Sequence, residues 1–247
     1  DEVPFRRGSK AALFAPDRAP MPRDAMEHCF QIASYSRADV LALTRGLPKA
    51  MLAWKASDDA MSIREILRHI GNAEEWYVSR IVSPRSLPPE WKRDDELPLF
   101  KFLEMERRTT MERLRRLTDR QLTEVNYPKR WTKHPQEPWT ARKAFRRYLE
   151  HEQEHLAHIR EVLAAWRAHL LARMATERAA LFAALVGLDE ATLTQQPIIG
   201  KWTAKDLLAH IPAWDELFAE RIELALAGRA SEIKRVDLNK RNAALYE

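Results

Sequence analysis

The sequence predicts an all-α fold, an up-and-down four-helix bundle followed by a partial second helical repeat. Alanine, leucine, arginine and glutamate dominate the 247 residues, and glycine occurs only six times. These residue types favour helices, whereas clusters of β-branched residues, which favour sheets, are few. Apolar residues recur at helical spacing, and two long stretches of the chain resemble each other. These features indicate helices that pack through an apolar face.

The internal repeat aligns residues 37–81 with residues 178–222 at a constant offset of 141. Thirteen of these 45 positions are identical, whereas chance would give about three or four in a chain so rich in alanine and leucine. His69 aligns with His210, and Gly46 aligns with Gly187. Each glycine follows an apolar-periodic stretch, where helices commonly end. The repeated unit is therefore a helix, a glycine stop, a loop and a second helix.

Four helices are expected in the first copy. The first covers residues 24–45 and is opened by Asp24, and the second covers 63–82 and is opened by Ser62, whose hydroxyl can cap free N–H groups. A proline-rich loop follows, and the third helix covers 99–117. The fourth helix starts after Thr140. Four helices with mostly short or polar connections make a bundle the natural architecture.

No glycine or proline interrupts the chain from Ala141 to Val186. The fourth helix of the first copy can therefore continue into the first helix of the second, as one helix of about 45 residues and about 68 Å. The alternative is a break near residues 167–175, which this composition does not forbid.

Three segments follow from the repeat: an N-terminal extension (1–23), a four-helix bundle (24–166) and an incomplete second repeat (167–247). The second repeat holds helices 1 and 2 and the start of helix 3, because Glu247 corresponds to Glu106. Its apolar face needs a cover, since half a bundle left exposed associates readily. We expect a homo-oligomer, such as a dimer, or a further C-terminal segment.

Composition excludes several classes of protein. The single cysteine, Cys29, rules out an internal disulfide framework and fits a reducing cytoplasm. No apolar run reaches the roughly 20 residues that span a bilayer, so no membrane association is expected. The net charge is +5, but basic and acidic residues are interspersed. This pattern indicates a solvated surface and does not favour a nucleic-acid partner.

Three histidines are the strongest candidates for chemistry. His151 and His155 are four residues apart on one helix and therefore share a face, and His69 lies on the second helix. Three imidazoles with one open position form the ligand set of catalytic zinc-type sites. The sequence therefore predicts a metal site at His69, His151 and His155.

The alternative is that each histidine is a hydrogen-bonded structural residue. Glu150, Glu152 or Glu154 could accept the free Nδ1–H of a ligand, or could simply pair with nearby arginines. No general base can be assigned, since Glu150 and Glu154 are no more than candidates, and the catalytic residues therefore stay unassigned. His158 falls at the polar margin of the helix, and no catalytic role is assigned to the remaining histidines, His28, His134 and His169.

Four tryptophans of the first copy lie near helix ends or loops, at positions 54, 76, 131 and 139. They could form an apolar mouth, although tryptophans more often serve core packing. Cys29 is expected to be a small buried residue. It does not suit a nucleophile pair with His28, because adjacent helical residues point about 100° apart. No glycine-rich phosphate loop is present.

Two stretches resemble the DinB/YfiT-like superfamily of metal-binding four-helix bundles. Residues 202–210 (WTAKDLLAH) resemble the family's helix 2 motif, and the first-copy version at 61–69 (MSIREILRH) has Met61 where the family usually has Trp. Residues 148–159 (YLEHEQEHLAHI), preceded by Trp139 and Thr140, resemble its helix 4. The segment 236–246 also resembles the start of helix 3 in mycothiol-dependent relatives.

The resemblance implies a divalent ion, nickel, zinc or iron, on His69, His151 and His155. It also implies a metal-dependent transferase or hydrolase that uses a low-molecular-weight thiol and a small electrophilic substrate. The second repeat lacks counterparts of His151 and His155, so a separate site at His210 is not expected. The alternative function is a non-catalytic, stress-related binding or interaction protein that keeps the bundle as a scaffold.

Overall fold

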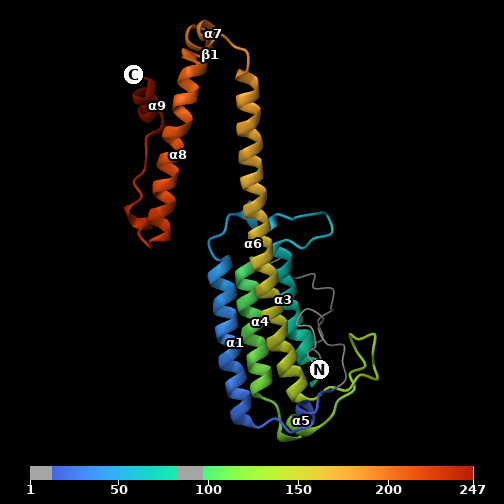
Figure 1. Ribbon diagram of the computed structural model, residues 1–247. Helices are drawn as coiled ribbons and strands as arrows, with labels where there is room; N and C mark the ends of the chain where they lie inside the picture. Colours follow the sequence, from blue (N-terminus) through green and yellow to red (C-terminus); the bar gives the residue numbers. More distant parts are fainter. Residues whose placement is uncertain (1–12, 83–96, 247) are drawn as a thin grey trace. The chain divides into compact units, whose positions relative to one another are not determined.

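A computed structural model describes residues 13–82 and 97–246 of the chain. The chain divides into two compact units, Asp1–Ala172 and Arg173–Glu247. The described part of the first unit begins with the 3₁₀ helix η1 (Pro16–Arg18) and contains the long helices α1 (Arg23–Thr44), α3 (Ile63–Val78), α4 (Leu99–Arg115) and most of α6 (Ala141–Leu185), with two short helices, α2 (Lys49–Ala53) and α5 (Asp119–Thr123). Helices α1, α3, α4 and α6 form a four-helix bundle (Figure 1), which confirms the expected fold class.

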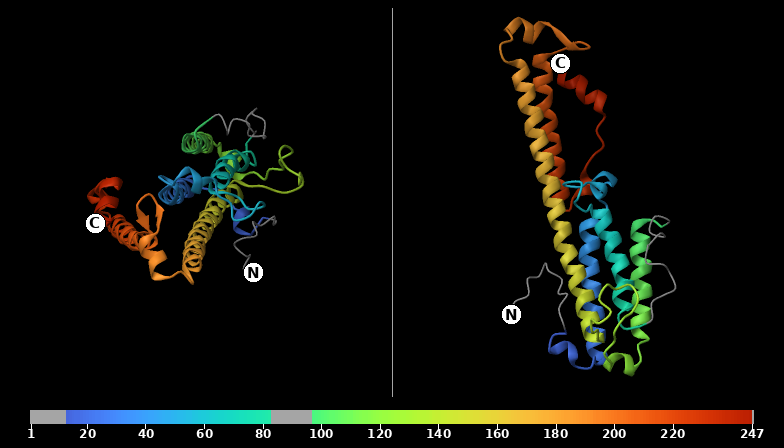
Figure 2. Two further views of the ribbon diagram at one scale, coloured as in Figure 1. Left: turned by 90° about the horizontal axis from the view of Figure 1, so that it is seen from above. Right: turned by 90° about the vertical axis from the view of Figure 1, so that its right-hand side faces the viewer.

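The four helices of the bundle meet at one level through buried charged side chains, and they run in two opposite directions. Arg37 reaches Glu74 and Glu152, and Arg107 reaches the same two carboxylates. Helices α1 and α6 run in one direction, and α3 and α4 run in the other, as Figures 1 and 2 show. Phe102, near the start of α4, lies against Gly71 of α3, and Arg107, further along α4, donates to Glu74, which is further along α3.

Helices α3 and α4 are therefore parallel neighbours, and the order of directions is up, down, down, up. The four-helix bundle is as expected, but the strict up-and-down alternation of helices is not kept at the connection between α3 and α4. Strict alternation follows when connections are short. The connection 79–98 has 20 residues, and a chain of that length can reach about 66 Å, which exceeds the length of either helix. The chain can thus return to the end of the bundle at which α3 began.

The ends of α3 follow from local chemistry. Ser62 forms a capping box with Glu65, in which each side chain accepts from the backbone N–H of the other residue. After Val78 the hydrogen bonds tighten to i→i+3, from Arg80 N to the Tyr77 carbonyl and from Ile81 N to the Val78 carbonyl. The α-helix thus ends four residues earlier than the expected boundary at 82.

The other expected helices agree closely with those observed. Helix α1 begins at Arg23 after Pro22, so Asp24 lies within the first turn, where its charge favours the helix dipole, rather than at the N-cap. Gly46 follows α1 with φ of +86°, a conformation that glycine adopts without strain. The long helix is confirmed, because α6 has 45 residues without a break at 167–175.

Two apolar clusters fill the bundle, and a layer of buried charges separates them along every helix. Arg37 of α1, Glu74 of α3, Arg107 of α4 and Glu152 of α6 form this charged layer. The first cluster includes Phe30, Tyr77, Leu114 and Phe145, and the second includes Val40, Ile70, Leu103 and Ile159.

The charged layer is closed on itself. Arg37 donates to Glu152 at 2.7 Å and to Glu74 at 2.5 Å, and Arg107 donates to Glu152 at 2.7 Å and to Glu74 at 3.1 Å. Arg37 also donates to the backbone carbonyl of Leu103, and Arg107 donates to the backbone carbonyl of Ala33. Burial by itself would raise the pKa of Glu152, but the attraction of the two guanidinium groups outweighs burial and lowers it.

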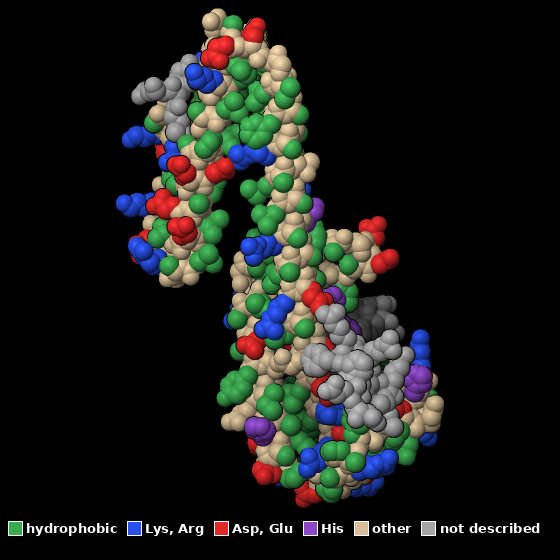
Figure 3. Space-filling model, in the orientation of Figure 1, with side chains coloured by type: hydrophobic (Ala, Val, Ile, Leu, Met, Phe, Trp, Pro, Cys, Tyr) green, Lys and Arg blue, Asp and Glu red, His purple; other side chains and the backbone are tan. Residues whose placement is uncertain are grey.

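The second unit contains the C-terminal part of α6, then α7 (Glu190–Gln195), a hairpin of β1 (Pro197–Ile199) and β2 (Trp202–Thr203), α8 (Ala204–Leu226), the 3₁₀ helix η2 (Ala230–Glu232) and α9 (Leu238–Tyr246). The strands pair antiparallel, with Pro197 opposite Thr203. Thr203 forms a capping box with Asp206 at the start of α8, as Ser62 does at α3. Hydrophobic side chains gather along α8 (Figure 3). Phe218, Ile222 and Leu226 of this helix are exposed.

Features of the repeat recur at the offset of 141. Gly187 has φ of +84°, close to that of Gly46. Arg178 pairs with Asp215 at 2.8 Å, and these positions correspond to Arg37 and Glu74. The segment boundaries expected at residues 23 and 166 stay predictions. Within the described ranges, no helix is both long and apolar enough to cross a membrane.

Glu74→Gln is expected to lower the free energy of unfolding by about 3–5 kcal/mol, because it leaves two buried guanidinium groups facing one carboxylate. Urea denaturation measures this change. The control is Glu124→Gln, which removes the same charge from the pair that Glu124 forms with the exposed Arg120. That substitution should cost less than about 1 kcal/mol. Equal costs for the two variants would contradict the role given to the buried layer.

Gly71→Ala is expected to destabilise the bundle, because a Cβ at Gly71 would lie 2.3 Å from Cε1 of Phe102. Overpacking of this kind costs about 1–3 kcal/mol, which exceeds the gain of about 1 kcal/mol that alanine brings to a helix. Phe102→Leu in the same chain should restore part of the loss. A Gly71→Ala variant as stable as the wild type in urea would show that α3 and α4 do not pack this closely.

Candidate metal centre

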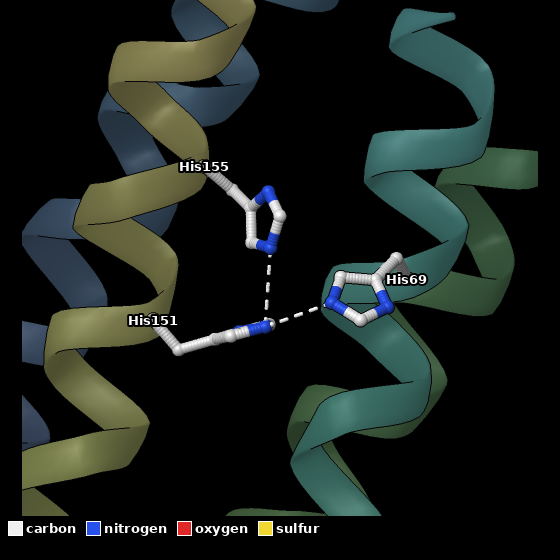
Figure 4. A group of neighbouring side chains, drawn as sticks. All are labelled: His69, His151 and His155. Carbon is white, nitrogen blue, oxygen red and sulfur yellow. Dashed lines mark hydrogen bonds between the residues drawn. The ribbon is translucent and has the colours of Figure 1, made fainter. Parts of the chain in front are cut away.

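The three histidines expected as ligands lie together on two antiparallel helices of the bundle. His69 projects from α3, and His151 and His155 project from successive turns of α6 (Figure 4). The Nε2 atom of His151 lies 3.0 Å from Nε2 of His69 and 3.1 Å from Nε2 of His155. Among the described residues this is the one group of histidine, cysteine and carboxylate side chains that could hold a metal ion.

The two short contacts of His151 cannot both be hydrogen bonds of neutral rings. An imidazole nitrogen carries either one proton or one lone pair, so Nε2 of His151 can donate once or accept once. At most one of the two contacts can then be a directed hydrogen bond, because the second neighbour finds no proton or lone pair of its own on this atom. An ion shared by three lone pairs removes this conflict.

The two spacings that involve His151 also fit a shared ion. Zinc binds histidine nitrogen at about 2.0–2.1 Å, which places neighbouring ligand nitrogens about 2.9–3.4 Å apart for angles between octahedral and tetrahedral. The observed 3.0 Å and 3.1 Å fall within this range. The donor set of three imidazoles suits zinc, nickel or iron.

The environment keeps the three rings neutral. Burial, with smaller contributions from His155, His69 and Arg147, lowers the pKa of His151 to about 2. Burial and the neighbouring His69 and His158 lower the pKa of His155 to about 4. Partial loss of hydration also lowers the pKa of His69, although part of this side chain is exposed. Neutral imidazoles are the form that binds a metal, so these nitrogens are ready to coordinate one near neutral pH.

The site is open on one side. His69 is exposed, whereas His151 and His155 are half-buried. Three protein ligands that face solvent on one side leave room for a further, non-protein ligand, which is the feature that separates catalytic metal sites from closed structural ones.

The carboxylates near the histidines do not support them as the sequence suggested. Glu150 accepts hydrogen bonds from Arg146 and Arg147, and Glu154 accepts one from Arg147. Glu152 belongs to the charged layer. The buried Nδ1 atom of His155 has no hydrogen-bond partner. Of the two roles considered for these glutamates, pairing with arginines is the one observed, and none of the three accepts the Nδ1–H of His155.

Three of the four tryptophans considered for an apolar mouth lie together. Trp76 packs against Trp139, with ring centres 5.5 Å apart, and its Nε1 donates to the carbonyl of Trp131 at 2.9 Å. Trp54 instead packs against Trp166 and His169. Cys29 is a free, half-buried thiol whose pKa is raised by burial, as expected for a packing residue.

Two residues beside the site had no role in the sequence analysis. The ring of Tyr77 lies 5.4 Å from that of His151, and burial raises the pKa of Tyr77 to about 12. Arg147 holds both Glu150 and Glu154. Tyr77 is eight residues after His69, a spacing that returns to the same face of α3, and this spacing is the signal that could have found it.

The second unit has only part of such a site. His210, the counterpart of His69, lies between the rings of Trp202 and Trp214, at 4.9 Å and 5.9 Å. The residues described in this unit bring no other potential ligands to His210 that would complete a metal group.

Comparison with known proteins identifies the family. The model of the DinB superfamily matches residues 33–159 and again residues 160–244. The chain therefore belongs to the DinB superfamily. None of the curated proteins matches the sequence.

Among solved structures, the chain is similar to YfiT from Bacillus subtilis, described as "a probable metal-dependent hydrolase with an unusual four-helix bundle topology". The sequences are 16% identical, and the match covers 62% of this chain and 93% of the YfiT chain with a TM-score of 0.46.

Proposed function

We propose that this protein is a metal-dependent enzyme whose single divalent ion is held by His69, His151 and His155. The observation that carries the proposal is the convergence of three Nε2 atoms, two of them within 3.1 Å of the third. A cation explains both short contacts, whereas hydrogen bonding between neutral rings explains at most one. Nickel, zinc and iron all suit three imidazole nitrogens.

The class of reaction that we propose is transfer of a thiol or hydrolysis, acting on a small electrophilic molecule. A divalent ion lowers the pKa of a thiol or water that binds it and so supplies a nucleophile near neutral pH. The exposure of His69 supports access of a small molecule to this site. The thiol transferase activity is supported by the family resemblance of the helix 2 and helix 4 motifs.

The neighbouring residues have positioning roles in this proposal. The buried ring of Tyr77 packs on the ring of His151, and Trp76 and Trp139 pack beside Tyr77. These aromatic rings limit the rotation of His151 and exclude water from one side of it. Arg147 holds Glu150 and Glu154 in ion pairs, so neither carboxylate is assigned as a general base.

A second candidate function is supported because no general base is assigned among the described residues. In that alternative the protein is a stress-related binding or interaction protein that keeps the bundle and the ion as a scaffold. A panel of low-molecular-weight thiols and electrophiles separates the two functions. Turnover by the metal-loaded protein supports the enzyme, and a stable protein partner without turnover supports the scaffold.

Two further expectations are kept as proposals. The free thiol of Cys29 supports a cytoplasmic location.

A homo-oligomer is supported by the second unit, where Met174, Phe218 and Ile222 are exposed although the positions 141 residues earlier, Ala33, Tyr77 and Ile81, are buried. Sedimentation equilibrium measures the oligomeric state, and a monomer at all concentrations would contradict the homo-oligomer.

Metal content measured by elemental mass spectrometry tests the proposed centre. After reconstitution with nickel, zinc or iron(II), the wild type is expected to retain about one ion per chain. The double variant His151→Ala, His155→Ala should retain less than about a tenth of that amount, because one imidazole binds divalent ions weakly.

The matched control is His158→Ala, which removes a histidine from the same helix whose ring lies 6.1 Å from that of His155. This variant should keep the full metal content, and circular dichroism checks the fold of each variant. Equal metal content in the double variant and the control, or no metal in the wild type, would contradict the proposal.

A further inference from the structure

Arg80 is a buried cation that the metal centre does not use. It follows α3 directly, and its side chain is 1% exposed. Its Nε donates to the Trp76 carbonyl and to Oγ of Ser79, and its Nη2 donates to Oγ of Ser79 and to the carbonyl of Arg130. The guanidinium also lies over the Trp76 ring, 4.3 Å from its centre.

Every one of these partners is electrically neutral. The buried Nη1 atom of Arg80 has no hydrogen-bond partner, and the described residues place no carboxylate within ion-pair distance of Arg80. Glu137, whose charge acts on Arg80, is bound at 2.8 Å by the buried Lys143. Burial lowers the pKa of Arg80 to about 10. A buried charge without a counter-ion is costly, so this position favours an added negative charge.

Arg80 lines a cavity of about 390 Å³ between the end of α3 and the segment that follows α5. Its wall also carries further donors and cations, beside the apolar Ile81, Val82 and Pro128. The buried Nδ2 of Asn126 has no acceptor, and Lys129 and Arg130 add two positive charges. The carboxylate of Glu124 is also on the wall, but Arg120 binds it at 2.8 Å. The wall therefore complements an anion.

The backbone beside the cavity is held in an uncommon conformation. Trp131 has φ of +55°, in the left-handed region that bulky side chains rarely adopt. In this conformation its carbonyl accepts from Trp76, while the preceding carbonyl of Arg130 accepts from Arg80. Strained residues of this kind persist where the surroundings hold them, and they are common at ligand sites. The loop thus fixes Arg80 at the cavity.

The second unit repeats this arrangement. Arg221 aligns with Arg80 at the offset of 141. Arg221 is half-buried, donates to the backbone carbonyl of Lys234 at 2.7 Å, and lines a separate cavity together with Lys234 and Arg235, whose wall also carries the carboxylate of Asp237. An arginine that donates to a backbone carbonyl and borders a basic cavity therefore occurs at both aligned positions.

We infer that the cavity at Arg80 is a binding site for a small molecule that carries a carboxylate or a phosphate group. The anionic group supplies the counter-charge that Arg80 lacks and accepts from the Nδ2 donor of Asn126. The site lies outside the histidine cluster, and its occupation does not require a metal ion.

Thermal unfolding with added inorganic phosphate or acetate, against chloride at equal ionic strength, tests this inference. The double variant His151→Ala, His155→Ala in the presence of a chelator serves as the background, so that anions cannot act through a bound metal. A ligand that binds only the folded state raises the midpoint. We expect a rise of about 2–5 °C with at least one of the two anions, and the anion that acts identifies the group. No rise with either anion overturns the inference.

Two variants locate the effect. Arg80→Gln should abolish the rise, whereas Lys133→Gln, which removes an exposed charge outside the cavity wall, should keep it. Because Arg80→Gln can also impair folding, Asn126→Asp gives a second test. It places a carboxylate on the cavity wall and should raise the midpoint without added anion while removing the response to it. An unchanged response in Arg80→Gln or in Asn126→Asp overturns the inference.

Discussion

The buried layer of Arg37, Glu74, Arg107 and Glu152 joins all four helices of the bundle at one level. Each charge has two partners of opposite sign, so no helix can rotate or slide without leaving a buried charge unpaired. Glu152 lies between His151 and His155 in the sequence, and Glu74 is five residues after His69. The pairing that satisfies the charges therefore also fixes which faces of α3 and α6 carry the imidazoles toward each other.

The proposed metal centre relies on this fixed frame and receives little support from hydrogen bonds of its own. The backbone places His69 and His151 with their Nε2 atoms 3.0 Å apart, while Tyr77 packs against His151 from α3. The usual support of a histidine ligand, an acceptor for its second nitrogen, is missing at His155. Apolar packing and burial thus do more than hydrogen bonds to orient these rings, and the same burial keeps them neutral and able to bind a cation.

Helical periodicity was sufficient to predict the fold class, and the lack of glycine or proline from 141 to 186 predicted the 45-residue helix. The i, i+4 spacing of His151 and His155 placed them on one face, His69 on a second predicted helix completed the expected ligand set, and the family resemblance pointed to the same three residues. Pairing of Glu150 and Glu154 with arginines was one of two roles considered for them, and the sequence alone could not decide between arginines and a histidine ligand, because both lie within reach on the same helix. The charged layer and the parallel α3 and α4 depend on contacts between residues far apart in sequence, which no local pattern encodes.

X-ray absorption spectroscopy of the nickel- or zinc-loaded protein tests the central claim, that three imidazoles hold one ion and leave a position open. The account predicts scattering from three imidazole rings together with light atoms from solvent. Addition of a small thiol should then bring a sulfur atom to the ion without displacing an imidazole. A spectrum with fewer than three imidazoles, or with four protein ligands and no change on thiol addition, would contradict the account.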